Sequence, residues 1–212
     1  MKQNANMAYI LFLLLLLMAG CQSSSTNKGD THISFLWKME NYTDFTSVNC
    51  TLSKVTDPVY QCEYSWRLTP NSSPRDPDYP EVKIETTFNP EKNPNVFEKW
   101  ITANRVFIDI HVPEESNFNS CFVYVWDDKA YWDPEIGNGW VDGVFYQGVF
   151  KTGWNRIALP LTFKIKDLDA SRPRTYKIGF GFRHLAEDQE EFKENGYPLN
   201  QVPVHIGGIG VF

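Results

Sequence analysis

The chain is a succession of short segments with β-strand character, and proline, glycine, asparagine and aspartate lie between them. The segments are rich in valine, isoleucine, threonine and aromatic residues, which favour strands. We expect strands at 33–40, 48–55, 60–68, 82–88, 105–112, 121–127, 144–150, 156–163, 175–185 and 202–212. No stretch has a long 3.6-residue apolar repeat, so we expect little helix beyond one short turn at 187–194. Many short strands without helices predict an all-β fold, a two-sheet antiparallel β-sandwich of the jelly-roll type.

The first 20 residues have the pattern of a bacterial lipoprotein signal. Lys2 supplies a positive charge, and the apolar run 10–18 is too short to span a bilayer. Residues 16–21 read Leu-Leu-Met-Ala-Gly-Cys, in which small residues precede a cysteine. The pattern predicts cleavage before Cys21 and attachment of several acyl chains there, which anchor stably where one chain binds reversibly. An ordinary secretory signal or an uncleaved anchor is the alternative.

This signal predicts three parts: a signal peptide at 1–20, a lipidated flexible tether at 21–31 and one β-sandwich domain at 32–212. We therefore expect a lipid-anchored protein at the cell surface or in the periplasm of a bacterium. Gln22, in the place of an aspartate, favours the outer membrane where the cell has two. The net charge is −6 and no run of basic residues occurs, which argues against nucleic acid as a partner. No second apolar stretch is long enough to cross a membrane, so the lipid is the expected membrane contact.

Three cysteines follow the lipidated one. Cys50 and Cys62 flank a turn at 56–58, where they could form a disulfide across a hairpin, or remain two buried thiols. Cys121 lies among apolar residues and is expected to be buried. No cysteine and histidine spacing resembles a zinc site.

Alternation along three strands separates a core face from an outer face. The expected core residues are Val106, Ile108, Ile110 and Val112, then Cys121, Val123 and Val125, then Tyr176, Ile178, Phe180 and Phe182. The opposite faces carry Phe107, Asp109 and His111 on the first strand, Phe122, Tyr124 and Trp126 on the second, and Lys177, Gly179, Gly181 and Arg183 on the third. If these strands are neighbours, they form one surface with an aromatic floor, polar groups and room above the glycines.

Such a surface suits sugars, whose rings have apolar faces edged by hydroxyl groups. Aromatic rings stack on the faces, and a few fixed polar groups orient the hydroxyls. The residues we expect to bind carbohydrate are Phe107, Asp109, His111, Tyr124, Trp126, Trp132, Trp140 and Arg183. Burial in the core is the alternative for the three tryptophans, and hydrogen bonding within the sheet is the alternative for Asp109 and His111. Trp37, Trp66 and Trp154 are expected in the core, and Trp100 is undecided.

Several segments in order resemble the strands of galactose-binding-like jelly-roll carbohydrate-binding modules, with the mannan-binding modules of β-mannanases nearest. They are Phe-Leu-Trp-Lys-Met-Glu at 35–40, Tyr-Ser-Trp-Arg-Leu at 64–68, Val-Phe-Ile-Asp-Ile-His-Val-Pro at 106–113, Gly-Trp-Asn-Arg-Ile-Ala-Leu at 153–159, Tyr-Lys-Ile-Gly-Phe-Gly-Phe at 176–182 and Ile-Gly-Gly-Ile at 206–209. The resemblance implies a β-glycan-binding module without catalysis, serving separate glycanases or sugar transporters. It also implies a structural Ca²⁺ site, for which Glu40 matches one ligand. The usual aspartate of the last strand is absent from 206–209, so we expect no cofactor, with this Ca²⁺ as the one alternative.

Two other functions remain open at this stage. Exposed aromatic residues also form protein interfaces, so an adhesive or structural lipoprotein with a protein partner is one alternative. The other is a jelly-roll glycanase or polysaccharide lyase. A glycanase needs two carboxylates across the bond, and Asp109 has His111 rather than a carboxylate at the next position on its face. A lyase could use His111 or a tyrosine as its base and Arg183 to bind an acidic sugar.

Overall fold

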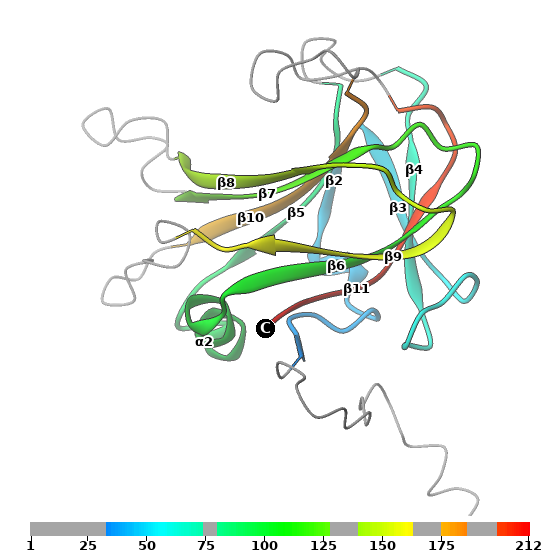
Figure 1. The fold of residues 1–212 in the computed structure, drawn as a ribbon. Helices are drawn as coiled ribbons and strands as arrows, with labels where there is room; N and C mark the ends of the chain where they lie inside the picture. Colours follow the sequence, from blue (N-terminus) through cyan, green and yellow to red (C-terminus); the bar gives the residue numbers. More distant parts are fainter. Residues whose placement is uncertain (1–32, 74–79, 128–139, 163–174, 186–198) are drawn as a thin grey trace, which may run out of the picture.

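The computed structural model describes residues 33–73, 80–127, 140–162, 175–185 and 199–212. Within these ranges the chain forms two antiparallel sheets that pack face to face (Figure 1). The strands are β1 (Ser34–Phe35), β2 (Thr46–Val48), β3 (Cys50–Val55), β4 (Ser65–Pro70), β5 (Val82–Phe88), β6 (Arg105–Val112), β7 (Ser120–Asp127), β8 (Trp140–Gln147), β9 (Gly153–Pro160), β10 (Tyr176–Arg183) and β11 (Val204–Val211). The predicted all-β sandwich is therefore confirmed.

The two sheets divide the strands in an order that differs from their order in sequence. Sheet A has the strand order β3-β4-β11-β6-β9, with β1 added beside β11. Sheet B has the order β2-β5-β10-β7-β8. The consecutive strands β6 and β7 therefore belong to opposite sheets, while β7 and β10 are direct neighbours.

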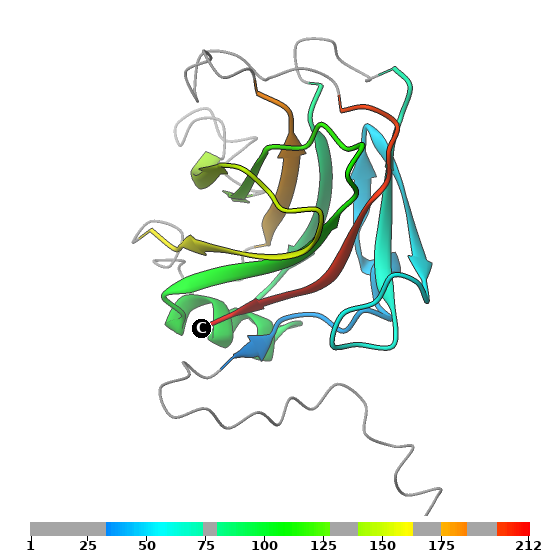
Figure 2. The ribbon, with the colours of Figure 1, turned by 45° about the vertical axis from the view of Figure 1, so that its right-hand side comes forward.

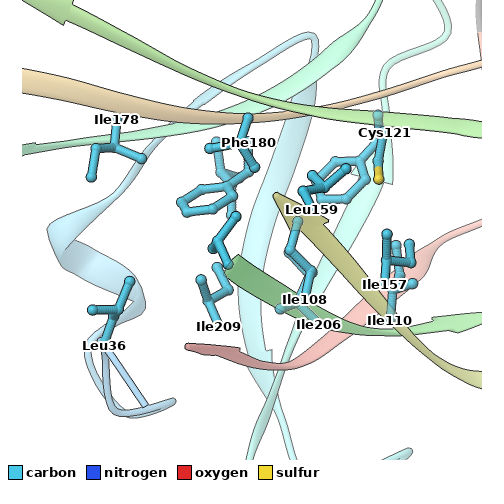
Figure 3. Packing of buried hydrophobic residues seen from close by; sticks show 14 of the residues in the cluster. Leu36, Ile108, Ile110, Cys121, Ile157, Leu159, Ile178, Phe180, Ile206 and Ile209 are labelled. Carbon is cyan, nitrogen blue, oxygen red and sulfur yellow. The ribbon is translucent and has the colours of Figure 1, made fainter. Parts of the chain in front are cut away.

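The core fills the space between the sheets (Figure 3). Ile178, Phe180 and Cys121 extend from sheet B toward Ile108 and Ile209 of sheet A. All of the core residues predicted from alternation on β6, β7 and β10 are at most 4% exposed. Burying each large apolar side chain contributes about 1.5–3 kcal/mol. This burial fixes which face of each strand points outward.

Two tryptophans anchor the core as well. Trp66 is fully buried, and its indole Nε1 donates to the carbonyl oxygen of Met39 at 2.6 Å. Trp100 is also fully buried. Trp66 thus confirms the prediction, and Trp100 is resolved as a core residue. Trp37 packs partly buried against the core, whereas Trp154 lies outside it on the outer face of sheet A.

The structure differs from the predicted elements at the start of the chain and before β6. The strand expected at 33–40 is reduced to β1, because the chain turns at Lys38, whose carbonyl accepts from Asn41, and continues into the 3₁₀ turn η1 (Tyr42–Asp44). Helix α2 (Pro94–Thr102) was not predicted. It begins with a proline and buries Phe97 and Trp100, three residues apart, against the core. Figures 1 and 2 both show α2 beside the C-terminal end of β11. Within the described residues, no helix is long and apolar enough to cross a membrane.

The structure holds Cys50 and Cys62 as separate thiols rather than as a disulfide. Cys50 pairs with Pro70 at one end of the β3–β4 hairpin. Cys62 lies in the loop that joins the two strands at the other end, where Val55 pairs with Ser65. Five residues of strand separate these ends, about 17 Å, which is far beyond the reach of a disulfide. Cys121 is fully buried as predicted, and burial raises the pKa of its thiol to about 12.

Candidate functional site

The outer face of sheet B has a floor of aromatic rings laid across glycines. Gly179 and Gly181 of β10 pair with Tyr124 and Phe122 of β7. A Cβ atom at Gly179 would lie 2.0 Å from Cζ of Tyr124, and one at Gly181 would lie 2.0 Å from Cζ of Phe122. Because β10 has no side chain at these two positions, both rings lie against its backbone.

This floor continues across the neighbouring strand β8. The ring of Phe122 is stacked with that of Tyr124 at 5.8 Å and with that of Phe145 at 5.5 Å, with interplanar angles of 28° and 25°. Arg183 holds its guanidinium 5.1 Å from the centre of Phe122 and 5.2 Å from that of Phe145. We call Phe122, Tyr124 and Phe145 the aromatic strip. Its three rings are roughly parallel, and the buried Arg183 guanidinium contacts two of them.

Charged groups border the strip on the β5 side. The Tyr124 hydroxyl donates to Oε1 of Glu85, and Nζ of Lys177 lies 3.9 Å from Oε2 of Glu85. Further along β5, Nζ of Lys83 lies 3.0 Å from Oε1 of Glu81. Burial, and then the charge of Glu85, raise the pKa of Tyr124 above its ordinary value. The Tyr124 phenol is therefore protonated at neutral pH, while Glu85 and Lys177 offer an acceptor and a donor to a ligand.

The structure separates the eight predicted site residues into two groups. Tyr124, Trp126 and Arg183 share the outer face of sheet B, as predicted. Phe107, Asp109 and His111 belong to β6 and lie on the outer face of sheet A, on the opposite side of the sandwich. The assumption that all three strands are neighbours is thus wrong, because β6 pairs with β9 and β11 rather than with β7 or β10.

Two residues of the β6 group are also closed off from a ligand. Phe107 is fully buried, against Phe35 at 5.5 Å and the guanidinium of Arg156 at 4.4 Å. Asp109 is 1% exposed, and its two oxygens accept from Nε and the terminal nitrogen of Arg156 at 2.7 and 2.8 Å. Asp109 therefore has the alternative role given above, a hydrogen-bonded partner within the sheet.

Of the three predicted tryptophans, the structure describes the side chain of Trp126 alone. Trp126 of β7 is partly exposed, and its cross-strand partners are Lys177 on β10 and Trp140 on β8. This register places the backbone of Trp140 in the same row of sheet B. Trp132 lies outside the described residues.

The expected room above the glycines is a second correction. Tyr124 and Phe122 occupy that space and are only 4% and 7% exposed. Among the described residues, the accessible part of the face includes the partly exposed Trp126 and Phe145 with Glu85 and Lys177 beside them. Phe145 and Glu85 were not among the predicted residues. Their alternation with the buried Val144 and Ile84 was the available signal, but it did not indicate which strands are neighbours.

A different cluster lies on the outer face of sheet A. His111 and His205 are cross-strand partners, with ring centres 5.9 Å apart. Trp154 lies edge-on to His111 at 5.3 Å, and Tyr60 stacks on Trp154 at 5.2 Å. Burial, then the charges of His111 and Arg67, lower the pKa of His205 to about 4 against an opposing effect of Asp57. We call Tyr60, His111, Trp154 and His205 the imidazole cluster.

The described residues do not fit the Ca²⁺ site that the sequence resemblance implies. Glu40 is exposed to solvent, and β11 carries Gly207 and Gly208 where carboxylate ligands would be needed. No group of three or more histidine, cysteine, aspartate or glutamate residues in the described ranges could hold a metal ion. Calcium requires six to eight oxygen ligands, so this part of the chain does not supply a calcium site.

No protein-family model matches the chain, and no curated protein matches it. Solved structures that resemble it include carbohydrate-binding modules of β-sandwich type. One is from work on promiscuous specificity in such modules, with 16% identity, a TM-score of 0.45, and 88% of this chain and 63% of that chain covered. This chain thus spans less than two thirds of that protein.

Two further structures are similar at the same level. A module with specific mannan recognition has 11% identity and a TM-score of 0.42, with 85% of this chain and 95% of that chain covered. A family 11 module from Clostridium thermocellum, in complex with a β-1,3-1,4-mixed-linked tetrasaccharide, has 11% identity and a TM-score of 0.44, with 80% and 88% covered. Similarity at this level does not identify a ligand, which must be argued from the residues of this chain.

The contact between Gly179 and Tyr124 can be tested with a double-mutant cycle. Gly179→Ala forces the Tyr124 ring away from β10, and we expect it to lower the free energy of unfolding by about 1–3 kcal/mol. In a Tyr124→Ala background the ring is absent, so the same substitution should cost at least about 1 kcal/mol less. Urea denaturation measures all four proteins, with the exposed Thr87→Ala as control. Additive effects of the two substitutions would contradict the contact.

The lowered pKa of His205 predicts a loss of stability in acid. The unfolded chain binds a proton at His205 near pH 6.5, whereas the folded chain does so at about 4. Stability from this group is therefore complete above pH 6.5 and falls as the pH drops toward 4. Relative to His205→Gln, the wild type should lose about 1–2 kcal/mol between pH 7 and 4.5, less than a complete shift gives because His205 is partly exposed. Urea denaturation at both pH values in EDTA measures this change in the free energy of unfolding. An equal change in the wild type and in His205→Gln would contradict the prediction.

Proposed function

We propose that the chain is a membrane-anchored, non-catalytic protein that binds a β-glycan, mannan-like or of another plant or cell-wall type, on the outer face of sheet B. The observation that carries the proposal is the partly exposed aromatic surface at the aromatic strip. Phe145 of the strip and Trp126, two positions from Tyr124 on β7, are partly exposed next to the buried rings of Phe122 and Tyr124. Pyranose rings stack on such surfaces through their C–H faces.

The polar border of the strip supports the same ligand class. Glu85 and Lys177 lie 3.9 Å apart at its edge and have side chains 19% and 37% exposed. A carboxylate accepts from a sugar hydroxyl and an ammonium donates to one, so the pair can bind neighbouring hydroxyls of one ring. Charges of both signs occur here, which favours a neutral glycan over a polyanion.

The arrangement of this face argues against catalysis on it. Glu81, just before β5, is 5% exposed and is paired with Lys83, so of the carboxylates Glu81 and Glu85 only Glu85 is accessible. Glycosidases need two carboxylates that both reach the glycosidic bond. The raised pKa of Tyr124 keeps its phenol protonated, and His111 lies on the other sheet, so neither residue offers a base here. These features support a binding role.

The proposed anchor rests on the sequence pattern at 16–21, which lies outside the described residues. Acylation of Cys21 would hold the sandwich at an extracytoplasmic membrane surface through the polar segment 22–31. A surface-held module of this kind keeps polysaccharide near the cell for separate glycanases or transporters.

Calorimetric titration with mannan, cellulose, xylan and mixed-linkage β-glucan oligosaccharides tests the binding proposal. We expect Kd values in the micromolar to millimolar range, about −8 to −4 kcal/mol. Trp126→Ala removes the exposed platform and should weaken binding by up to about tenfold, because stacking on one aromatic ring is worth about 0.5–1.5 kcal/mol and about 1.4 kcal/mol corresponds to tenfold. Trp154→Ala on the other sheet is the matched control and should leave Kd unchanged. Circular dichroism verifies that each variant is folded.

Two results would count against the proposal. The absence of heat from every glycan at high protein concentration would favour a protein partner instead. Weaker binding in Trp154→Ala with full binding in Trp126→Ala would move the ligand to sheet A.

Metabolic labelling with radioactive palmitate tests the anchor. The wild-type protein, produced in a bacterium, should carry the label and partition with the membrane fraction. Cys21→Ala removes the acceptor sulfur and should abolish both properties, whereas Cys62→Ala should retain them. Label that persists in Cys21→Ala would refute lipidation at this position.

A further inference from the structure

The imidazole cluster contains two histidines held opposite each other on neighbouring strands. His111 of β6 and His205 of β11 are directly paired in the antiparallel register. Their ring centres are 5.9 Å apart, with an interplanar angle of 79°. Paired residues of an antiparallel sheet have their Cβ atoms about 4.5–5.5 Å apart, so the backbone fixes this spacing.

Both histidines contain a buried nitrogen that the protein does not satisfy. Nδ1 of His111 and Nδ1 of His205 are enclosed, and neither has a hydrogen-bond partner. Buried polar atoms are nearly always paired with a protein group, a water molecule or an ion. Two such atoms on adjacent imidazoles indicate a shared external partner.

The surroundings restrict both rings. Trp154 lies edge-on to His111 at 5.3 Å, and its ring covers Gly207, where a Cβ atom would lie 2.7 Å from the indole. Tyr60 stacks on the indole and completes the cover. The charges that face the pair are those of Arg67, the cross-strand partner of His205 on β4, and of Asp57 in the loop after β3. These opposite charges partly offset each other at the site.

We propose that His111 and His205 bind a divalent transition-metal ion of the Zn²⁺, Ni²⁺ and Cu²⁺ class. Imidazole nitrogens are preferred ligands of these ions, whereas Ca²⁺ and Mg²⁺ require oxygen. Two imidazoles that each coordinate one ion at about 2.0–2.1 Å have ring centres roughly 5–6 Å apart, as these two rings have.

His111 and His205 are each partly exposed as residues, although their Nδ1 atoms are enclosed. The described residues contain no group of three ligand side chains, so water completes the coordination. Two protein ligands give weaker binding than a structural zinc site with four, and a micromolar Kd is the expected range. The ion would join β6 to β11 across the centre of sheet A. The inference is independent of glycan binding, because it concerns the opposite face of the sandwich.

Titration of the full chain, produced without a histidine tag, with Ni²⁺ and Zn²⁺ tests the site. We expect one site per chain with micromolar Kd. His111→Gln and His205→Gln should each weaken it at least tenfold, and the double variant should bind no more weakly than either single one, because one imidazole alone does not chelate. His184→Gln is the control and should bind as the wild type does.

Spectroscopy and stability provide measurements that do not depend on calorimetry. Electron paramagnetic resonance of bound Cu²⁺ should show coupling to two nitrogens in the wild type and to one in each single variant. The midpoint temperature of thermal unfolding should rise with Zn²⁺ concentration in the wild type alone. Thermal unfolding in EDTA verifies that the variants fold. Metal affinity and a Cu²⁺ spectrum unchanged by His111→Gln and His205→Gln would overturn the proposal. Loss of the site in His184→Gln would also overturn it.

Discussion

The burial of every second side chain between two sheets is the constraint on which the rest of the structure depends. On β6, β7 and β10 the inward residues are at most 4% exposed, so each strand has one face committed to the core. The outward residues are thereby freed for other contacts, and the core fixes their spacing. Both the aromatic strip and the imidazole cluster are outward sets of this kind, one on each side of the sandwich. A slip of one residue in any of these strands would exchange the two sets and destroy the core together with the surface.

Alternation allowed the core residues and the fold class to be predicted from the sequence, because it is a property of each strand by itself. The partners of a strand are not encoded in that way. Asp109 and Tyr124 lie on consecutive strands, yet the chain crosses from sheet A to sheet B between them. The prediction that the three strands share one surface was wrong because of this crossing. The prediction of open space above Gly179 failed for a related reason, since a glycine leaves room that a neighbouring ring can fill.

The same reasoning explains the other differences. Trp154 was expected in the core because it lies in a strand-like pattern. It shares its face with the exposed Arg156, while the buried Ile157 and Leu159 occupy the other face. Counting positions from Ile157 would have placed it outside. Helix α2 spans only nine residues, too short for a periodic pattern to stand out. Its apolar face consists of the buried Phe97 and Trp100 with Val96 and Ile101 partly buried beside them. The separation of Cys50 from Cys62 depends on where the hairpin turns, which the loop between β3 and β4 decides.

The two glycines of β10 also set the scale of what can lie on sheet B. On the outward side of this strand, the first large side chains on either side of them belong to Lys177 and Arg183. Six residues of strand, about 20 Å, separate these two positions. Over that length the rings of Tyr124 and Phe122 cover the glycines, so aromatic side chains from β7 form the outer layer of the sheet above β10. This stretch is longer than a single monosaccharide, so on the proposed binding face the length of a glycan, rather than the identity of one unit, would govern how tightly it is held.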